Sequence, residues 1–307
     1  MRVIVLGSAA GGGVPQWNCA CDNCRAARSG DGVAARTQDS LAVSADGRRW
    51  FLLNASPDLP QQLARSPELA PHGRGERRRS PIAGVVITNG DLDHCLGLLS
   101  LREWTPLSLY ATGHTRAGLV EHNAMFRTLQ RRDPHFVHRA LPLHQAQPLL
   151  DGDDRDSGLR VRAIPVEGKL PLHLQGLMEP TAETNVGLVV EHPASATRIV
   201  YVPSARSVDG IREAARGAQV LFFDGTFWSE AELSRLERAA GSASEMAHLP
   251  VSGPGGSLEQ LASLAVEQRI FTHVNNTNPM LRRGSPERAL VERRGWVIAV
   301  DGLELEP

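Results

Sequence analysis

Short apolar runs alternate with polar turns along most of the chain, and this pattern predicts strands more often than helices. Runs such as IAGVVIT and VLFFD are apolar almost throughout and end at a polar residue, which is typical of buried strands. The predicted strands cover residues 2–6, 40–44, 48–54, 82–88, 107–111, 159–166, 185–191, 198–202, 220–224, 269–273, 296–300 and 303–306, with the last two as a pair.

Apolar residues at helical spacing predict helices between these strands. Leu258, Leu261 and Leu264, for example, share one face of a predicted helix. Strand groups interrupted by helices favour packed sheets with helices outside, and we find no linker that divides residues 1–307 into two domains. The predicted helices cover residues 57–63, 95–104, 115–128, 208–216, 230–240 and 257–267, and residues 71–81 are predicted to form a loop.

The composition is that of an ordinary globular protein, with 41% hydrophobic and 22% charged residues, which excludes a disordered or collagen-like chain. The 33 basic and 34 acidic residues nearly cancel and only 5% of residues are aromatic, so nothing indicates a nucleic-acid partner. No apolar run is long enough to span a membrane, and the N-terminal residues lack the apolar core of a secretory signal. We therefore expect a cytoplasmic protein with no membrane partner.

Three of the four cysteines, Cys19, Cys21 and Cys24, lie close together in the sequence. A disulfide framework would spread its cysteines, and a cytosolic compartment would keep them reduced. Thiolates are soft ligands, and three at this spacing can surround one ion, which predicts structural Zn²⁺ with a fourth ligand from a distant segment. Three unrelated buried thiols are the alternative. Cys95 is expected to be a small buried residue.

Polar residues that could bind a metal follow three of the predicted strands. Asn and Asp are also good helix caps, and a single His at a strand end is usually structural. Several carboxylates and imidazoles at strand ends together, however, favour a site for Zn, Mn or Fe. The candidate ligands at these strand ends are Asp91, Asp93, His94, Asp224 and His273.

A glycine-rich turn at residues 7–13 follows the first predicted strand, as a dinucleotide-binding turn would. The turn lacks the G-x-G-x-x-G spacing, and Pro15 and the cysteines follow it in place of a helix. A dinucleotide site is therefore not predicted. The chain also contains neither a G-x-S-x-G elbow nor a P-loop.

At these residues the chain resembles the metallo-β-lactamase superfamily, and within it the branch that acts in pyrroloquinoline quinone biosynthesis. The resemblance spans nearly the whole chain. It implies an α/β fold, an αββα sandwich of two mixed β-sheets with helices outside, and structural zinc on the cysteine triplet. The matching segments are LGSAAGGGVPQWNCACDNC (6–24), ITNGDLDHCLGLLSLRE (87–103), FFDGTFW (222–228), HLPVSGPGGSL (248–258) and THVNNTNPML (272–281).

The chain departs from the superfamily in its first metal site. Asn89 and Asp91 stand where the resemblance places two His ligands of that site, and no His lies at residues 166–169, where the third is expected. The second site keeps its ligands Asp93, His94 and His273. Two His and one carboxylate are the ligand set of non-haem Fe(II) oxygenases, whereas a dinuclear hydrolase needs two neighbouring ions.

The resemblance also assigns roles to other residues. Asp224 is either a fourth iron ligand or the anchor of a His. Asp91 is a catalytic acid or base or binds the substrate amine, and Asn89 lines the same vacated pocket. His248 stands where related phosphodiesterases have a catalytic His, so it is a candidate acid or base, with a hydrogen-bonded loop His as the alternative. Asn276 stands where those relatives supply the fourth zinc ligand as His, and the change to Asn leaves this ligand open.

The implied reaction uses Fe(II) and O₂ to hydroxylate the tyrosine ring of a peptide-derived substrate, a Glu-Tyr unit from which the quinone is built. The carboxylates of such a substrate predict a cationic anchor, and Arg102 and Lys169 are the candidates. Two other functions remain open: a metal-dependent hydrolase acting on a phosphodiester, lactone or peptide, and a non-enzymatic carrier that takes part in export of the cofactor. A homodimer and contacts with other proteins of the pathway are further expectations.

Overall fold

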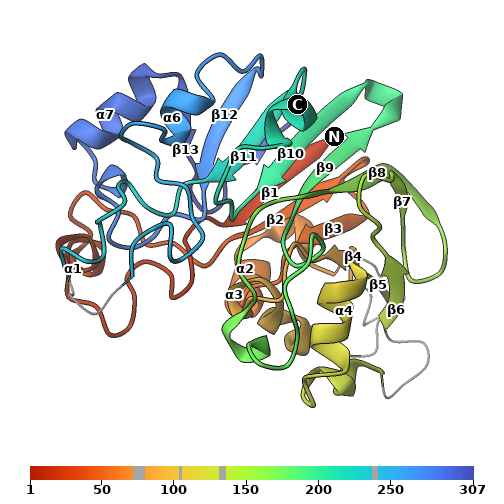
Figure 1. The fold of residues 1–307 in the computed structure, drawn as a ribbon. Helices are drawn as coiled ribbons and strands as arrows, with labels where there is room; N and C mark the ends of the chain where they lie inside the picture. Colours follow the sequence, from red (N-terminus) through yellow and green to blue (C-terminus); the bar gives the residue numbers. More distant parts are fainter. Residues whose placement is uncertain (72–79, 104–105, 131–135, 237–240) are drawn as a thin grey trace.

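Two β-sheets pack face to face and carry helices on their outer faces in the computed structural model, which describes residues 1–71, 80–103, 106–130, 136–236 and 241–307 (Figure 1). The first sheet contains β1 (Arg2–Gly7), β2 (Ser40–Ser44), β3 (Trp50–Leu53), β4 (Ile82–Val86), β5 (Leu107–Ala111), β6 (Phe136–Ala140) and β14 (Glu304–Leu305). The second contains β7 (Gln147–Leu150), β8 (Asp156–Pro165), β9 (Val186–His192), β10 (Thr197–Val202), β11 (Val220–Asp224), β12 (Gln268–Thr272) and β13 (Trp296–Ile298). The helices are α1 (Asp22–Ser29), α2 (Leu59–Arg65), α3 (Leu92–Cys95), α4 (Gly113–Val120), α5 (Ile211–Ala215), α6 (Ser257–Gln260) and α7 (Pro286–Arg293).

Each sheet is mixed and has a run of parallel strands. The strand orders are β14-β1-β2-β3-β4-β5-β6 and β13-β12-β11-β10-β9-β8-β7. Strands β3 to β6 are parallel to one another in the first sheet, and strands β10 to β13 are parallel in the second. Because the carboxyl ends of parallel strands meet at one edge, side chains that follow β4, β11 and β12 are candidates for a shared site.

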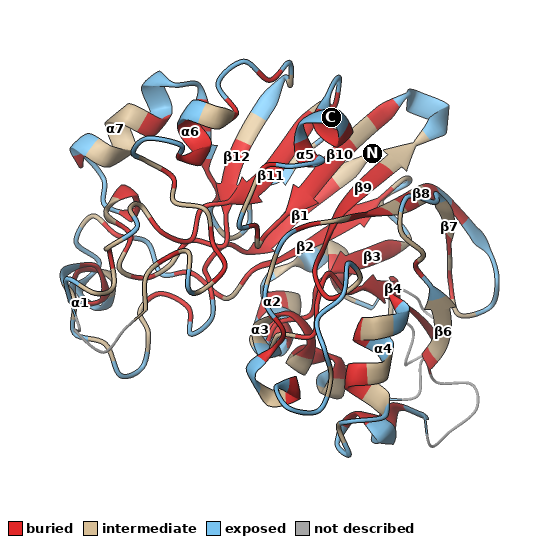
Figure 2. Ribbon diagram, in the orientation of Figure 1, coloured by how far each residue is buried: buried red, intermediate tan, exposed pale blue. Residues whose placement is uncertain are grey.

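Alternation of side chains along the strands builds the central core. Val3 and Val5 of β1 point between the sheets, whereas Ile4 and Leu6 point to the outer helical layer. The same two-residue period on β10 directs Tyr201 between the sheets. Both faces of the sheets are therefore buried over most of their area, as Figure 2 shows in red. Apolar strands with no polar face are the sequence signature of this layered arrangement.

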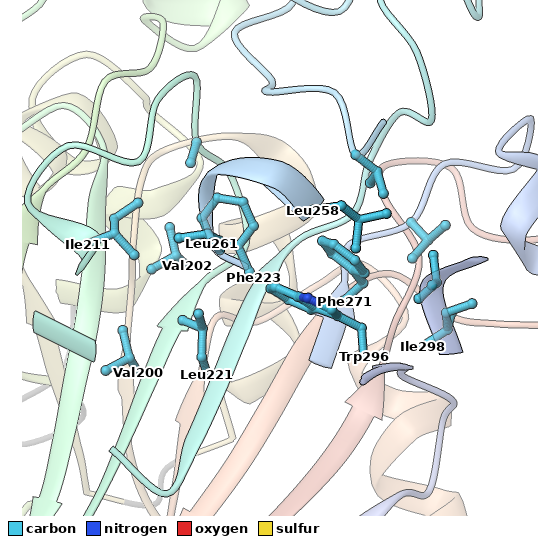
Figure 3. Close-up of a cluster of buried hydrophobic side chains, with 14 of the residues drawn as sticks. Val200, Val202, Ile211, Leu221, Phe223, Leu258, Leu261, Phe271, Trp296 and Ile298 are labelled. Carbon is cyan, nitrogen blue, oxygen red and sulfur yellow. The ribbon is translucent and has the colours of Figure 1, made fainter. Parts of the chain in front are cut away.

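The outer face of the second sheet packs against α5, α6 and α7. Figure 3 shows part of this apolar cluster, including Ile211 of α5 and Leu258 of α6. Leu258 and Leu261, at α6 and its end, lie in the same cluster as Phe223. Phe271 of β12 stacks on Trp296 of β13, with ring centroids 4.1 Å apart and planes at 12°. This stack buries two large side chains beside the strand that leads into His273.

One helix boundary differs from the prediction in a way that affects the site. The helix expected at residues 95–104 begins at Leu92, so Asp93 and His94 lie on its first turn. Asp91 is the N-cap residue in an extended conformation, and its carbonyl accepts the Cys95 N–H at 3.1 Å. The α-helix then tightens into a 3₁₀ helix at Leu96–Leu101, and residue 104 lies outside the described part.

Other local predictions were wrong, and most of these concern helices predicted from only a few apolar residues at helical spacing. The helix predicted at 230–240 is absent from its described part, where residues 230–236 form turns, and 237–240 lie outside the described residues. The helices predicted at 115–128 and 257–267 shorten to α4, followed by a 3₁₀ turn at Phe126–Gln130, and to α6. The predicted pair 296–300 and 303–306 does not form, because β13 joins β12 and β14 joins β1. The predictions missed α1, α7, β6 and β7, and residues 72–79 of the predicted loop are outside the described part.

In the described residues, no helix combines the length and apolar character that crossing a bilayer requires.

Candidate metal centre

Asp93, His94 and His273 bring their ligand atoms within 4.8 Å of one another. The Nε2 atom of His273 lies 3.1 Å from Oδ2 of Asp93, and the Nε2 atom of His94 lies 3.8 Å from the same oxygen. Asp93 and His94 follow β4 of the first sheet, and His273 follows β12 of the second. The centre therefore joins the two sheets at their common edge.

The glycine-rich turn forms one wall of this centre. Val274 donates its N–H to the carbonyl of Ser8 at 3.0 Å, and Ala10 donates to the carbonyl of Val274 at 3.0 Å. A side chain at Gly11 would place its Cβ 3.3 Å from Oδ2 of Asp93, so the missing side chain leaves room for that carboxylate. His273 adopts φ of 53°, a left-handed conformation that is costly for a residue with a side chain and collects at functional sites.

Two threonines hold the imidazoles in matching ways. Thr226 Oγ1 lies 2.8 Å from Nδ1 of His273, and Thr88 Oγ1 lies 3.2 Å from Nδ1 of His94. The Thr226 hydroxyl donates to Oδ1 of Asp224 at 2.6 Å. The Thr88 hydroxyl donates to Oδ1 of Asn54 at 3.0 Å. Because each hydroxyl donates its proton to one of these oxygens, it accepts a hydrogen bond from the imidazole Nδ1–H. The proton of each neutral imidazole is then on Nδ1, and the Nε2 atom is free to bind a metal.

The residues present fit a cation at this point. Nε2 of His94 is buried and has no hydrogen-bond partner among the described residues, which is unusual for a buried polar atom. Burial lowers the pKa of His94 to about 4, so its imidazole is neutral and able to ligate. Although burial alone would raise the pKa of Asp93, the imidazoles of His94 and His273 hold it well below its usual value. Burial opposes protonation of His273, but its hydrogen bond to Asp93 raises its pKa to about 9, and a bound cation would take the place of that proton.

Asp224 and His248 form a second buried pair beside the centre. Oδ2 of Asp224 accepts a hydrogen bond from Nδ1 of His248 at 2.6 Å and another from the N–H of Ala205 at 2.9 Å. Oδ1 accepts from the N–H and the hydroxyl of Thr226. Since a carboxylate has about four acceptor positions, these bonds favour Asp224 as the anchor of His248 over Asp224 as a metal ligand.

The centre opens into a cavity of about 200 Å³. Asp91 lines it, and burial together with the charge of Asp93 raises the pKa of Asp91 to about 6. Asn89 is buried, and its amide donates to Oδ1 of Asn185 at 2.9 Å, so it supports the wall. The cavity is lined by Ala10, Gly11, Asp91, Asp93, His94, Lys169, Ser204, Thr226, Phe227, Met246, His248, His273 and Asn275. Of the two predicted anchors, Lys169 lines the cavity, whereas Arg102 is exposed and pairs with Glu103 at 3.6 Å.

The cysteine triplet forms a separate cluster, with the Sγ atoms of Cys19, Cys21 and Cys24 within 4.8 Å of one another. Backbone N–H groups approach these sulfurs, and Cys21 is the N-cap of α1. Nδ2 of Asn276 lies 3.2 Å from Sγ of Cys24, so a half-turn of the amide would bring Oδ1 to the thiols. The donor set of three thiols with one adjacent amide fits a zinc ion. Cys95 is buried, as expected, and points to the carbonyl of Gly90.

A larger hollow of about 710 Å³ lies beside the cysteine cluster. Four of its charged side chains form two ion pairs, Arg25 with Asp22 and Arg282 with Asp31 at 3.7 Å. Asp91, Asp93, His94 and His273 all line the smaller cavity, and each has a strongly shifted pKa, so we place the centre of chemistry there.

An αββα sandwich whose strand ends bring Asp and His side chains to a common point defines a metal-binding protein of the metallo-β-lactamase class. Residues 49–274 match the family described as "Beta-lactamase superfamily domain". The chain belongs to this superfamily and, within it, to the family of coenzyme PQQ synthesis protein B, known as PqqB.

The relatives that show this membership match along their full length. Coenzyme PQQ synthesis protein B of Methylobacterium radiotolerans is 45% identical over 313 residues, which cover 99% of each chain. The crystal structure of Zn²⁺-bound PqqB from Methylobacterium extorquens is 40% identical, covers 100% of each chain and superposes with a TM-score of 0.89. A diphosphatase of the PhnP family, 23% identical with a TM-score of 0.66, covers 99% of this chain and 97% of its own and shares the fold. The predicted fold class and the resemblance are confirmed.

Proposed function

We propose that the protein acts in the synthesis of pyrroloquinoline quinone as a mononuclear non-haem iron enzyme that hydroxylates the tyrosine ring of a Glu-Tyr-derived precursor. The observation that carries this proposal is the convergence of Asp93, His94 and His273, two imidazoles and one carboxylate, on one point. The name of the relatives, coenzyme PQQ synthesis protein B, supports the pathway. The Zn²⁺ in the solved relative supports a metal-dependent function.

A dinuclear hydrolase is the weaker proposal, because the first-site positions offer no imidazole. The Asn89 side-chain amide donates a hydrogen bond to Asn185. Asp91 belongs to none of the candidate metal-binding clusters in the described residues. The histidine nearest to the missing third ligand, His173, does not line the cavity. Two ions roughly 3.5–4 Å apart, as two-metal hydrolysis requires, would lack ligands on this side.

The proposed reaction replaces a ring C–H by C–O–H. One oxygen atom of O₂ enters the product and the other leaves as water, with two protons and two electrons from an external donor such as a reduced flavin or ascorbate. Bound Fe(II) supplies the redox chemistry with O₂. His248, oriented by Asp224, and Asp91 are the groups of this chain that can hold or move protons beside the ring. The cavity walls orient the ring.

Metal analysis, element by element, tests the proposal on protein reconstituted anaerobically with Fe(II). We expect about one Fe and about one Zn per chain. The His94→Ala variant should lose the Fe and keep the Zn, and the Cys19→Ala variant should lose the Zn. Mass spectrometry of Glu-Tyr incubated with ¹⁸O₂ and a reductant should show ¹⁸O on the ring with wild-type protein and not with His94→Ala.

Two results would contradict the proposal. Retention of Fe in His94→Ala would contradict the assignment of His94 as an iron ligand. Two or more tightly held Zn or Mn ions beyond the cysteine cluster would show that a dinuclear centre exists, and the hydrolase would then become the better proposal.

A further inference from the structure

Lys169 is the only lysine among the 33 basic residues of the chain, and all the others are arginine. This single lysine lines the metal-site cavity. No arginine is among the described residues that line it. A chain that uses guanidinium groups at every other cationic position thus has its one ammonium group at the candidate active site.

The backbone before Lys169 is fixed against the side of the cavity that lacks metal ligands. Val166 donates its N–H to the carbonyl of Asn185 at 3.1 Å. Gly168 packs so closely on Asn185 that a Cβ would lie 2.6 Å from Nδ2 of that residue. Because the Asn185 amide also holds Asn89, this contact sets Lys169 beside the vacated first site.

The backbone after Lys169 packs against the same site. Pro171 lies against Gly90, where an added Cβ would be 3.4 Å from Cγ of the proline, and Leu170 is buried. Lys169 and Asp91 both line the cavity. Asp91 is the acidic group of this lining that lies outside the candidate metal-binding clusters of the described residues.

No ion pair of the described residues includes Lys169, whereas Glu167, two residues earlier, pairs with Arg206 at 3.5 Å. We propose that Lys169 binds a carboxylate of the substrate and holds it beside the metal ligands, so that the cavity selects an anionic substrate. This inference rests on the proposed function for the identity of the substrate, but the binding of a carboxylate by Lys169 can be tested without turnover.

The size of the cavity explains why lysine suits this position. At about 200 Å³ it is smaller than typical sites for whole small molecules, of about 300–1,000 Å³, so it receives one end of a substrate. An ammonium group is a compact charge whose three donors rotate, whereas a guanidinium group is a wide planar fork. A carboxylate at the end of a dipeptide is the anion that matches one compact cation.

The first test uses the single lysine as a chemical reporter. Acylation by an N-hydroxysuccinimide ester is followed by mass spectrometry of the peptide that contains Lys169, with the N-terminal amine as an internal reference. We expect Glu-Tyr or pyrroloquinoline quinone to slow acylation of Lys169 by roughly fivefold or more, as capture of the ammonium group requires. Glu-Tyr with both carboxylates amidated should not protect. The absence of protection by either carboxylate ligand would overturn the proposal, and equal protection by inorganic phosphate would overturn the choice of carboxylate.

The second test compares Lys169→Gln, Lys169→Arg and Arg216→Gln in Fe-reconstituted protein. Arg216 is exposed and precedes β11 at the end opposite to Asp224, so its replacement changes the net charge equally without touching the cavity. Loss of a charged hydrogen bond should raise the KM and the Kd for Glu-Tyr about tenfold or more in Lys169→Gln. Fe content should not change, and Lys169→Arg should recover only part of the binding.

These results separate the inference from the proposed function. An unchanged KM and Kd in Lys169→Gln, with hydroxylation intact, overturns the role of Lys169 and leaves the enzyme assignment in place. Lysine-dependent binding of Glu-Tyr without any ring hydroxylation in the wild type overturns the hydroxylase and supports the role of Lys169.

Discussion

Nδ1 of His248 lies 2.6 Å from Oδ2 of Asp224, and both residues are buried. The carboxylate is held in turn by three donors from Ala205 and Thr226. The His248 ring also stacks on that of His273, with centroids 5.6 Å apart and planes at 23°. The His248 imidazole is thus fixed beside the candidate metal ligand His273 by side chains and backbone of the protein.

Replacement of His248 by Ala should lower kcat for ring hydroxylation by about 10²–10⁴, the usual contribution of a positioned acid or base. Fe content should remain at the wild-type value, because His94, Asp93 and His273 are intact. Single-turnover rates and metal analysis of the same preparation measure both effects. His122→Ala, at an exposed position, serves as the matched control. If Fe is lost together with the rate, His248 is a ligand and the assignment changes.

Thr226→Val should weaken iron binding by about 10–100-fold, since partners that orient a ligating imidazole have effects of this size. Valine keeps the shape of threonine but removes the oxygen at 2.8 Å from Nδ1 of His273. Titration of the apoprotein with Fe(II) under anaerobic conditions gives the affinity. Thr226→Ser retains the hydroxyl and should restore binding; failure of serine to do so would attribute the loss to packing.

The sequence alone pointed to the candidate ligands, whose side chains the structure brings together, but not to the groups that orient them. Asp93 follows an apolar strand of the first sheet, whereas Asp224 ends and His273 follows apolar strands of the second, and the carboxyl ends of these strands meet where the two sheets share an edge. Thr88 and Thr226 carry no comparable signal, because a threonine after a strand is common and its partner lies on a distant segment. The role of Gly11 as a wall against Asp93 likewise depends on a contact across the sandwich.

Trp296→Ala should lower the free energy of unfolding by about 3–5 kcal/mol, the usual range for a large buried aromatic residue. Trp296 is 2% exposed and stacks on Phe271, two residues before His273. Urea denaturation of the zinc-replete protein measures the change. Trp296→Phe should lose much less, because it keeps a ring on Phe271 and removes an indole N–H that has no partner among the described residues. Equal losses in the two variants would mean that the stack contributes little.

Glu232 should make the protein less stable as the pH rises. Burial raises the pKa of Glu232 from 4.5 to about 7, although hydrogen bonds from Thr277 and Trp228 oppose the rise. The folded state therefore binds more protons than the unfolded chain between these values, so this stabilising contribution is complete below about pH 4.5 and is lost as the pH passes through 7. The loss is roughly 3 kcal/mol at most.

Urea denaturation at pH 5.5, 7 and 8.5 checks this dependence. Glu232→Gln cannot ionise, so it should flatten the decline between pH 5.5 and 8.5 and be more stable than the wild type at the upper end. Glu213→Gln, on a turn of α5 and exposed, should leave the decline as it is. A wild-type stability that rises over this range would contradict the burial argument.

The turns at residues 230–236 show a limit of predictions from periodicity. Their apolar spacing fits a helix, yet Glu232 folds back to accept the Trp228 N–H and the Thr277 hydroxyl. A side chain that hydrogen-bonds the nearby backbone competes with the helix, and the competing contact with Thr277 is remote in sequence. The strands β2, β5 and β11 were predicted well, because their apolar residues are buried on both faces and the apolar run itself marks the element.

The pairing of β1 with β14 has a consequence for synthesis of the chain. Val3 lies opposite Leu305, and the side chains of Arg2 and Glu304, 302 positions apart, form a hydrogen bond. A ribosome releases β1 long before β14, so one edge of β1 stays open while nearly all of the chain is being translated. An unpaired edge invites association with neighbouring nascent chains. The first sheet is thus completed only after translation has passed its final strand, although its first strand is also the first of the chain.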